Sequence, residues 1–326
     1  MATRHAKSPC CRERVRRFGK RRRQCSRCKR TWRVRKKRFG RKRSRVSKFL
    51  LARILLEHHT LTQEAKRLGV AQSVASKRMR LALLSVVSRQ FHISPRGRCI
   101  LLADGLYFRF KREHIVMYLM ALRPTKSSQA YFLDPVFVKG RERLEAWREA
   151  LEHIPLPIKK RIVAFVSDGF RGGAALAQEH GWVQQRCHFH MLAALSGKRG
   201  RKPYRLPNAD IRGKLLEATR VLLVAKHSGH VEKARRTIQD TIRSGGMPEH
   251  LRKHAVDLLE NLLSFRAHIA HPELDLPTTT NAVESMGRMV RKATRTARTP
   301  ESVLLRATAL LRLKKSIVCN GNHQPS

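Results

Sequence analysis

Apolar residues recur at helical spacing from about residue 46 onward, after a first segment in which they are sparse. They predict one helix in "SKFLLARILLEHH" and two more in "TLTQEAKRLGVAQSVASKRMRLALL", separated at Gly69. Thr60, followed three residues later by Gln63, has the pattern of a capping box at the start of the second helix. This periodicity predicts a small helical domain over residues 47–96.

Apolar runs of strand length replace this pattern from about residue 98. The runs "RCILLAD", "LYFRFK", "HIVMYLMAL" and "AYFLDPVFV" predict four strands, with Asp104-Gly105 as the tight turn between the first two. "GRERLEAWREALEHI" predicts a helix, and "RIVAFVSDG" predicts a fifth strand that ends at Asp168-Gly169. Consecutive strands, a helix and a further strand predict an α/β fold with a mixed sheet.

Helical periodicity returns after a basic linker, "SGKRGRKPYRLP", at residues 196–207. The segments that follow, up to about Ala270, carry apolar residues at 3.6-residue spacing. Two final helices are predicted over residues 281–297 and 300–317. We therefore expect a domain over residues 97–326 in which an all-helical block, about 200–275, follows the α/β part.

The charge of the chain restricts its partners. Its 326 residues are 41% hydrophobic, enough for a packed core, but 71 Lys and Arg against 23 Asp and Glu give a net charge of +48. Such a charge favours a polyanion, and nucleic acid is the expected partner because neutralising phosphates releases counterions. A membrane surface is the weaker alternative, because no apolar run approaches the roughly 18–20 residues that span a bilayer.

Residues 1–46 contain 22 Lys and Arg residues and a single acidic residue. A block of this charge has too few apolar residues for a core, so it is either a disordered basic arm or a segment stapled by a metal. Cys25 and Cys28 have zinc-knuckle spacing, and we expect them, with Cys11, to bind a structural Zn²⁺. Cys10 and His5 are the alternative further ligands. Seven cysteines without a secretion signal favour a reducing compartment, so we expect a cytoplasmic, nucleoid-associated protein.

Two carboxylates share a pattern that suggests chemistry. Asp104 and Asp168 each end an apolar run and precede a glycine. If their strands are neighbours, the carboxylates meet at one edge of the sheet, where a divalent cation such as Mg²⁺ or Mn²⁺ relieves their repulsion. For Asp104 alone a plain hairpin turn is the competing interpretation. For Asp168 a helical pattern follows, so the corner favours a site.

A third carboxylate lies in "TTTNAVESMGRMVRKATR". Asn281 and Glu284 fit a capping box, and a Glu284–Arg288 pair on a solvated helix face is a second structural interpretation. The functional interpretation is a carboxylate aimed at metal ions, with Arg288 and Arg291 behind it to hold phosphates.

Four motifs in a fixed order resemble the mutator-type (MULE-like) DDE transposases and their bacterial insertion-sequence relatives. These are "LLADGLYFRF", "VAFVSDGFRGG", "QRCHFHM" and "TTTNAVESMGRMVR", and the likeness covers roughly residues 98–318. It implies a ribonuclease H-like catalytic domain with a helical insertion at about 200–275. It also implies catalytic Asp104, Asp168 and Glu284 on two Mg²⁺ or Mn²⁺ ions. The separations are 168 − 104 = 64 and 284 − 168 = 116 residues.

The Cys-x-x-His motif of the same family matches Cys187 and His190. We expect a supporting role beside the active site for this pair, in preference to a zinc site, because no second ligand pair follows.

The resemblance implies a DNA transposase that cleaves element ends and transfers the strands, acting as a homo-oligomer on DNA. Residues 60–81 then fit a helix-turn-helix, with two ordinary bundle helices as the alternative. The side chains expected to face the DNA groove are Gln72, Ser73, Ser76, Lys77 and Arg80. Two other functions compete: an inactive or domesticated copy that regulates by binding DNA, and a nuclease that cuts without joining.

Overall fold

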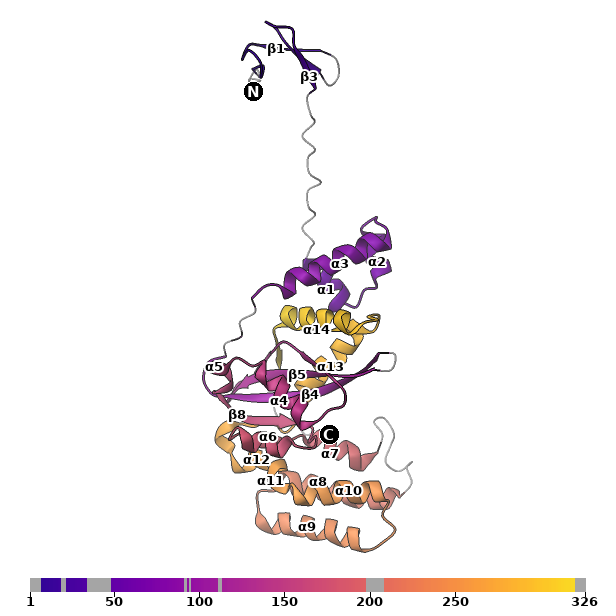
Figure 1. Cartoon of the computed structure of the whole chain (residues 1–326). Helices are drawn as coiled ribbons and strands as arrows, with labels where there is room; N and C mark the ends of the chain where they lie inside the picture. Colours follow the sequence, from indigo (N-terminus) through magenta and orange to yellow (C-terminus); the bar gives the residue numbers. More distant parts are fainter. Residues whose placement is uncertain are drawn as a thin grey trace. The chain divides into compact units, whose positions relative to one another are not determined.

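The computed structural model describes residues 7–18, 22–33, 48–90, 93, 95–110, 113–197 and 208–319. His5, one alternative metal ligand, and most of the basic linker lie outside these ranges. The chain divides into two compact units, Met1–Lys48 and Phe49–Ser326, which are described separately (Figure 1).

The first unit is a three-stranded antiparallel sheet in the order β1-β2-β3. The strands are β1 (Val15–Arg17), β2 (Arg22–Cys25) and β3 (Thr31–Arg33). The cysteines lie at the turns of this sheet, where Cys25 ends β2 and Cys28 lies in the β2–β3 turn.

The second unit begins with three helices, α1 (Lys48–Leu55), α2 (Leu61–Arg67) and α3 (Gln72–Val87). The predicted capping box is confirmed, because Gln63 N donates to Thr60 Oγ1 at 3.2 Å and Thr60 N donates to Gln63 Oε1 at 2.7 Å. Leu51 and Leu55 of α1 are buried, as are Ala75 and Met79 of α3.

The following residues form a mixed sheet in the order β10-β6-β5-β4-β8-β9, with β7 paired to β5. β4 runs parallel to β8, and β8 parallel to β9, whereas the other pairs are antiparallel. The predicted α/β class is confirmed, and this topology is compatible with a ribonuclease H-like fold. The strands are β4 (Cys99–Phe110), β5 (Glu113–Pro124), β6 (Gln129–Phe132), β7 (Val136–Lys139), β8 (Ile162–Ser167), β9 (Val183–Arg186) and β10 (Ser316–Val318).

The predicted turn at Asp104-Gly105 is wrong. β4 is one strand of 12 residues that passes straight through both positions, and Asp104 pairs with Leu119 and Gly105 with Tyr118 of β5. Because every residue from Cys99 to Phe110 has a partner on β5, the long ladder outweighs the local turn preference of Asp-Gly. The carboxylate is therefore fixed in the interior of a strand.

The segment "AYFLDPVFV" also differs from its prediction as one strand. It forms β6 and β7, interrupted at Leu133, Asp134 and Pro135. Proline cannot donate to a sheet ladder, which accounts for a break at this point.

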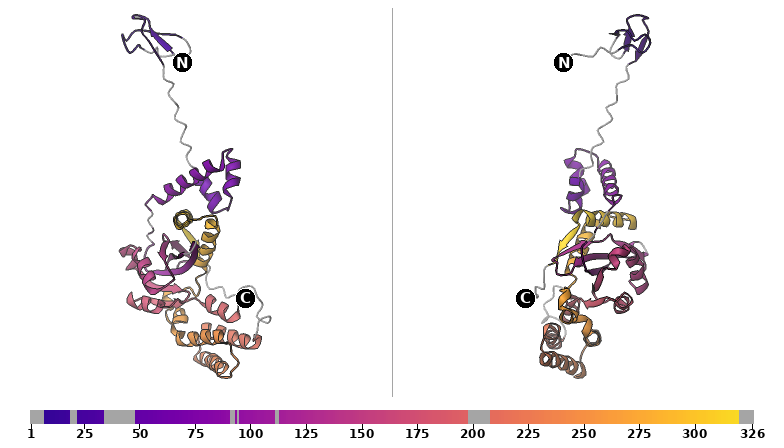
Figure 2. Two further views of the ribbon diagram at one scale, coloured as in Figure 1. Left: turned by 45° about the vertical axis from the view of Figure 1, so that its right-hand side comes forward. Right: turned by 90° about the vertical axis from the view of Figure 1, so that its left-hand side faces the viewer.

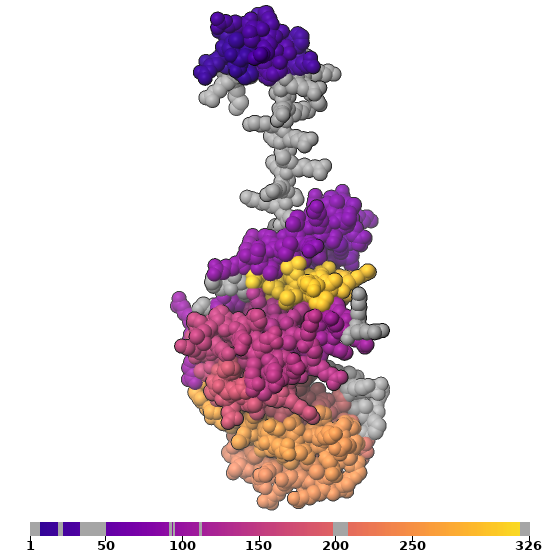
Figure 3. All heavy atoms as spheres, viewed as in Figure 1, coloured from indigo at the N-terminus to yellow at the C-terminus, as the bar shows by residue number. Residues whose placement is uncertain are grey.

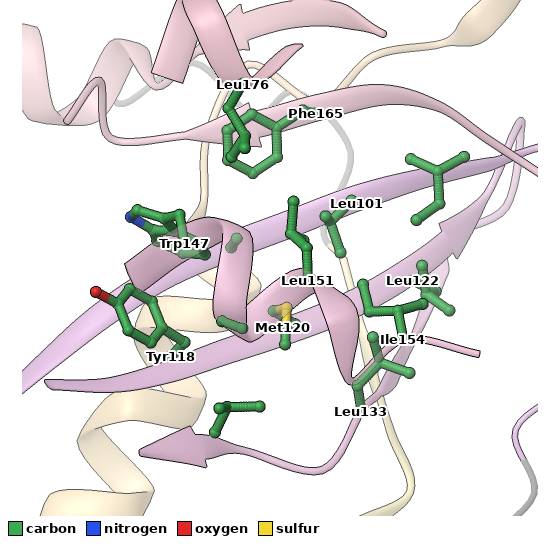
Figure 4. Packing of buried hydrophobic residues seen from close by; sticks show 14 of the residues in the cluster. Leu101, Tyr118, Met120, Leu122, Leu133, Trp147, Leu151, Ile154, Phe165 and Leu176 are labelled. Atoms are coloured by element: carbon green, nitrogen blue, oxygen red, sulfur yellow. The ribbon is translucent and has the colours of Figure 1, made fainter. Parts of the chain in front are cut away.

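Helices cover both faces of the sheet (Figures 1 and 2). The main core lies between the sheet and α4 and α6, where Trp147, Tyr118 and Phe165 are buried together (Figure 4). The opposite face of β4 is covered by α13, where Leu106 meets Gly287. The helices are α4 (Leu144–Glu152), α5 (Leu156–Lys159), α6 (Gly173–Glu179), α7 (His188–Ser196), α13 (Asn281–Thr294) and α14 (Pro300–Lys314).

A second core joins α7 to the helical block that follows it, which is coloured orange in Figure 3. Leu195 of α7, Leu222, Ile238 and Leu258 are fully buried in it. Its helices are α8 (Ala209–Val224), α9 (Ser228–Arg243), α10 (Glu249–Glu260), α11 (Leu262–Phe265) and α12 (Ala267–Ala270). Within the described ranges, no helix is long and apolar enough to cross a bilayer.

Helix α14 joins the three-helix segment to the rest of its unit by packing against both α3 and α13. The Arg312 guanidinium donates to both carboxylate oxygens of Asp134, at 2.9 and 2.5 Å. The same guanidinium donates to the carbonyl oxygens of Val87 and Arg89, each at 2.6 Å. One arginine thus ties the end of α3 to the β6–β7 connection.

Candidate functional site

Asp104 is positioned by the alternation of side chains along β4. Residues 104 and 106 share one face of the strand, and Leu106 lies against Gly287 of α13, so Asp104 faces the same helix. Burial, followed by the charge of Asp168, raises the pKa of the Asp104 carboxyl to about 7; the charges of Glu284 and Glu142 add to this effect and that of His190 opposes it. Three elements distant in sequence therefore place like charges around this residue.

Asp168 directly follows β8, which lies beside β4 in the sheet. The next residue, Gly169, has a φ of +92°, a conformation that side chains disfavour. The Arg186 guanidinium occupies the space that a Cβ at position 169 would take. Arg186 in turn donates to both carboxylate oxygens of Asp257, each at 2.8 Å. The absence of a side chain at position 169 thus allows the turn after β8 to pack directly against Arg186, whose ion pair with Asp257 links β9 to α10.

Glu284 lies in the first turn of α13 and is 8% exposed. The capping box with Asn281, one of the structural alternatives for Glu284, does not form: Thr280 is the N-cap residue, Asn281 is already helical, and no side chain caps this helix end. Glu284 Oε1 instead lies 3.3 Å from Thr280 Oγ1 and 3.6 Å from His190 Nδ1. The carboxylate is therefore directed into the protein and does not lie on a solvated face.

Cys187 and His190 belong to the same local network. The backbone N–H and the hydroxyl of Thr280 each lie 3.4 Å from Cys187 Sγ, so the sulfur anchors the start of α13. A hydrogen bond with Cys187, and then the charges of Glu284 and Asp168, raise the pKa of His190 to about 9. The raised pKa favours the protonated form of His190, whose charge partly balances the carboxylates.

The two arginines predicted to hold phosphates are both exposed on α13. Arg291 donates to the carbonyl oxygen of Tyr107 at 3.3 Å and stands 5.9 Å over the Phe108 ring. Arg288 Nη2 lies 3.5 Å from Ser285 Oγ. Arg291 thus brings positive charge to β4 beside Tyr107 and Phe108.

A fourth carboxylate, Glu142, was missed by the sequence analysis. Tyr107 OH donates to it at 2.6 Å and Trp147 Nε1 at 2.9 Å, while burial, followed by the charge of Asp168, raises its pKa. A Cβ at Gly105 would lie 3.0 Å from Glu142 Oε1, so Glu142 approaches the face of β4 opposite to Asp104. Nothing in the charged stretch "KGRERLEAW" distinguishes this glutamate from its neighbours. The related feature elsewhere in the sequence is Gly105, whose missing side chain leaves room for Glu142.

Among the described residues, two groups of three or more side chains have potential metal-ligand atoms within 4.8 Å of one another. One comprises Cys187, His190 and Glu284, and the other is the cysteine cluster of the first unit. Asp104 and Asp168 belong to neither group, although both act electrostatically on their neighbours. The charges of Asp168, Glu284 and Glu142 act on Asp104, but among the described residues these carboxylates do not form one group of ligand atoms within 4.8 Å of one another.

The cysteine cluster contains Cys10, Cys11, Cys25 and Cys28, and it could hold a metal such as zinc. The structure therefore adds Cys10, an alternative ligand from the sequence, to the three expected thiols. Four thiols within 4.8 Å of one another fit the tetrahedral coordination that Zn²⁺ takes in structural sites. The Ser8 hydroxyl, 3.3 Å from Cys25 Sγ, is the main cause that lowers the pKa of that thiol to about 6, which favours the thiolate that binds metal.

All five side chains predicted to face DNA are exposed on α3. They are Gln72, Ser73, Ser76, Lys77 and Arg80. Gln72 Nε2 also donates to Thr62 Oγ1 at 3.3 Å, which links the first turn of α3 to α2. The buried side of the helix carries Ala75 and Met79, so the polar residues form the free face.

Comparison of the sequence with models of known protein families gives no match, and comparison with curated proteins gives none either. The proposed function therefore rests on the residues of this chain and their arrangement.

Proposed function

We propose that this protein is a DNA transposase with a ribonuclease H-like core. One observation carries the proposal: Asp104, inside a central strand, lies beside β8, which leads into Asp168, and faces α13, which carries Glu284, and the charges of both residues act on it. These are the three carboxylates, in order and in context, that the resemblance to mutator-type DDE transposases marks as catalytic. The helical block α8–α12 lies between Asp168 and Glu284, as a helical insertion would.

The three carboxylates are the proposed ligands for two Mg²⁺ or Mn²⁺ ions. When bound, such ions supply Lewis acidity for a phosphodiester and lower the pKa of an attacking water. The rigid β4 strand holds Asp104, the β8 corner holds Asp168, and the Cys187–Thr280 contacts hold the helix end that carries Glu284. Arg288 and Arg291 bind the phosphates that flank the scissile bond.

The reaction has two steps. Water attacks the phosphodiester at the element end and releases a 3′-hydroxyl, which then attacks a phosphodiester of the target DNA. Both steps are displacements at phosphorus, so the same carboxylates serve both and no covalent protein intermediate is needed. Because two ends must be held together, we propose that the protein acts as a homo-oligomer on DNA.

The functional test is an assay with supercoiled donor DNA that carries the element ends, in the presence of Mg²⁺. A transposase produces cleaved ends and joined products. Cleavage without joining identifies a nuclease, and binding without cleavage identifies a DNA-binding regulator. Either of these two outcomes overturns the proposal.

The exposed face of α3 is proposed to read the element ends as the second helix of a helix-turn-helix. Replacing Lys77 and Arg80 together by alanine is expected to weaken DNA binding on the order of 10-fold or more, because two cationic contacts are lost. The slope of log affinity against log salt should fall by about 2. Fluorescence anisotropy over a salt series measures both quantities.

The matched control is the double variant Arg235→Ala and Arg243→Ala, which removes two exposed arginines from α9. It should bind DNA nearly as the parent protein does. An equal loss in both double variants would mean that α3 contributes only general positive charge.

His190 is proposed to position Glu284 and to balance the carboxylates. His190→Asn removes the cation beside Glu284 and is expected to slow strand cleavage by about 10–100-fold, the usual effect of losing a partner that orients a metal ligand. DNA affinity should stay unchanged, since the side chain lies away from α3. Single-turnover cleavage and anisotropy measure the two effects separately.

His230→Asn is the control for this substitution, because His230 is an exposed histidine on α9. If His190→Asn cleaves as fast as this control, the positioning role is wrong.

A further inference from the structure

Two turns in the first unit have the same backbone form. In one, Arg12 N donates to the carbonyl oxygen of Ser8 at 3.0 Å, and in the other Lys29 N donates to that of Cys25 at 3.2 Å. The last residue of each turn is left-handed, with a φ of 53° at Arg12 and 59° at Lys29. Non-glycine residues rarely adopt this conformation, so its occurrence at equivalent positions marks two copies of one local structure.

The equivalence fixes which positions carry metal ligands. In the second turn the first and fourth residues are Cys25 and Cys28, the two ends of a Cys-x-x-Cys knuckle. In the first turn the same two positions are occupied by Ser8 and Cys11. Ser8 is 2% exposed and Cys25 is fully buried. The burial of Ser8 is unusual, because a short basic segment has no hydrophobic core that would enclose a serine.

The Ser8 hydroxyl lies where the sulfur of a first ligand would lie. Its Oγ is 3.3 Å from Cys25 Sγ and accepts from the backbone N–H groups of Cys11, at 3.3 Å, and Glu13, at 3.1 Å. The fourth thiol of the cluster comes from Cys10, whose Sγ is 3.3 Å from Cys28 Sγ. Cys10 is the third residue of its turn, a position that carries Arg27 in the other copy.

We propose that residue 8 is a ligand position of a two-knuckle zinc site, held by serine in this chain, and that Cys10 supplies the missing thiolate from the neighbouring position. This inference rests on the proposed binding of Zn²⁺ by the cysteine cluster. It accounts for the adjacent cysteines, because Cys11 belongs to the knuckle and Cys10 replaces its absent first ligand. It also accounts for a buried serine in contact with a ligand sulfur.

The test uses the full-length protein loaded with Co²⁺, whose absorption increases with the number of bound thiolates. The parent protein should show four thiolate contributions, and Cys10→Ala should lose one of them and release metal to a competing chelator more readily. The double variant Ser8→Cys with Cys10→Ala should regain the fourth contribution and the original retention of metal.

The control is Ser26→Cys combined with Cys10→Ala, which restores the number of cysteines at the second position of the other turn. It should not regain the signal. The inference is overturned if Cys10→Ala keeps all four contributions, if Ser8→Cys fails to restore the fourth, or if Ser26→Cys restores it equally. A parent protein that binds neither Co²⁺ nor Zn²⁺ would instead refute the zinc site itself.

Discussion

Replacing Asp168 by asparagine is expected to reduce strand cleavage on the order of 10³-fold or more. When several residues act together on one reaction, replacing any one of them removes most of the activity. Asparagine keeps the size of the side chain and the corner at Gly169, but it removes the negative charge that holds a divalent cation. DNA binding should be retained, because the cationic surface and α3 are untouched. Single-turnover cleavage of an element-end substrate at saturating Mg²⁺ measures the loss.

Asp240→Asn is the control for this variant, since Asp240 is an exposed residue of α9 whose carboxylate faces Arg243. It should cleave as the parent protein does. Cleavage by Asp168→Asn within a few-fold of this control would remove Asp168 from the reaction and with it the proposed mechanism.

Asp104→Asn is expected to stabilise the fold at alkaline pH when no divalent cation is present. The pKa of Asp104 is raised from 3.8 to about 7 in the folded protein, first by burial and then by the charge of Asp168. The folded state therefore holds a proton that the unfolded state releases, so stability is full below about pH 4 and falls as the pH rises through 7. Discounted for the partial exposure of the carboxyl, the loss is about 2 kcal/mol.

Urea unfolding of both proteins at pH 4 and pH 8, in buffer free of divalent cations, measures this effect. The variant should exceed the parent by about 2 kcal/mol at pH 8 and by much less at pH 4. Taking the difference between the two proteins cancels any contribution from the cysteine cluster. If the free energy of unfolding of the two proteins changes in parallel over this pH range, the carboxylate of Asp104 is not destabilised by burial and by the charge of Asp168.

The helices were largely predictable because their signals are local. The 3.6-residue spacing of apolar residues located α1, α8 and α14, and the Thr60–Gln63 pattern gave the start of α2. The sheet was predictable in class only, because strand pairing depends on partners distant in sequence. At Asp104-Gly105 the local turn signal was overruled by the ladder to β5.

The site shows the same division between local and distant information. Asp104, Asp168 and Glu284 could be selected from the sequence, because the first two each end an apolar run before a glycine and the third lies near the start of a periodic helical pattern. Glu142 could not, since its partner Tyr107 belongs to β4, 35 residues away in the sequence. Gly105 is explained by the space that Glu142 requires, whereas its sequence context favoured a turn.

The cysteine cluster was half predictable for a similar reason. Cys25 and Cys28 have recognisable spacing, but the choice between Cys10 and Cys11 depended on how a turn folds around Ser8. In the structure both Cys10 and Cys11 belong to the cluster. Comparing the two turns shows that Cys11 is equivalent to Cys28, whereas Cys10 has no cysteine as its equivalent in the other turn.

The most direct test of the central claim is to map the metal site on the chain itself. Zinc-loaded protein is incubated with Fe²⁺, hydrogen peroxide and ascorbate. Bound Fe²⁺ reduces the peroxide to hydroxide and a hydroxyl radical, which cuts the backbone nearby, and ascorbate regenerates the Fe²⁺. The fragments are identified by mass spectrometry. We expect cuts near residues 104, 168 and 284 together, suppressed by excess Mg²⁺ and absent in Asp168→Asn. Cuts confined to the neighbourhood of Cys187 and His190, or a pattern unchanged by Asp168→Asn, would contradict a shared site built by the three carboxylates.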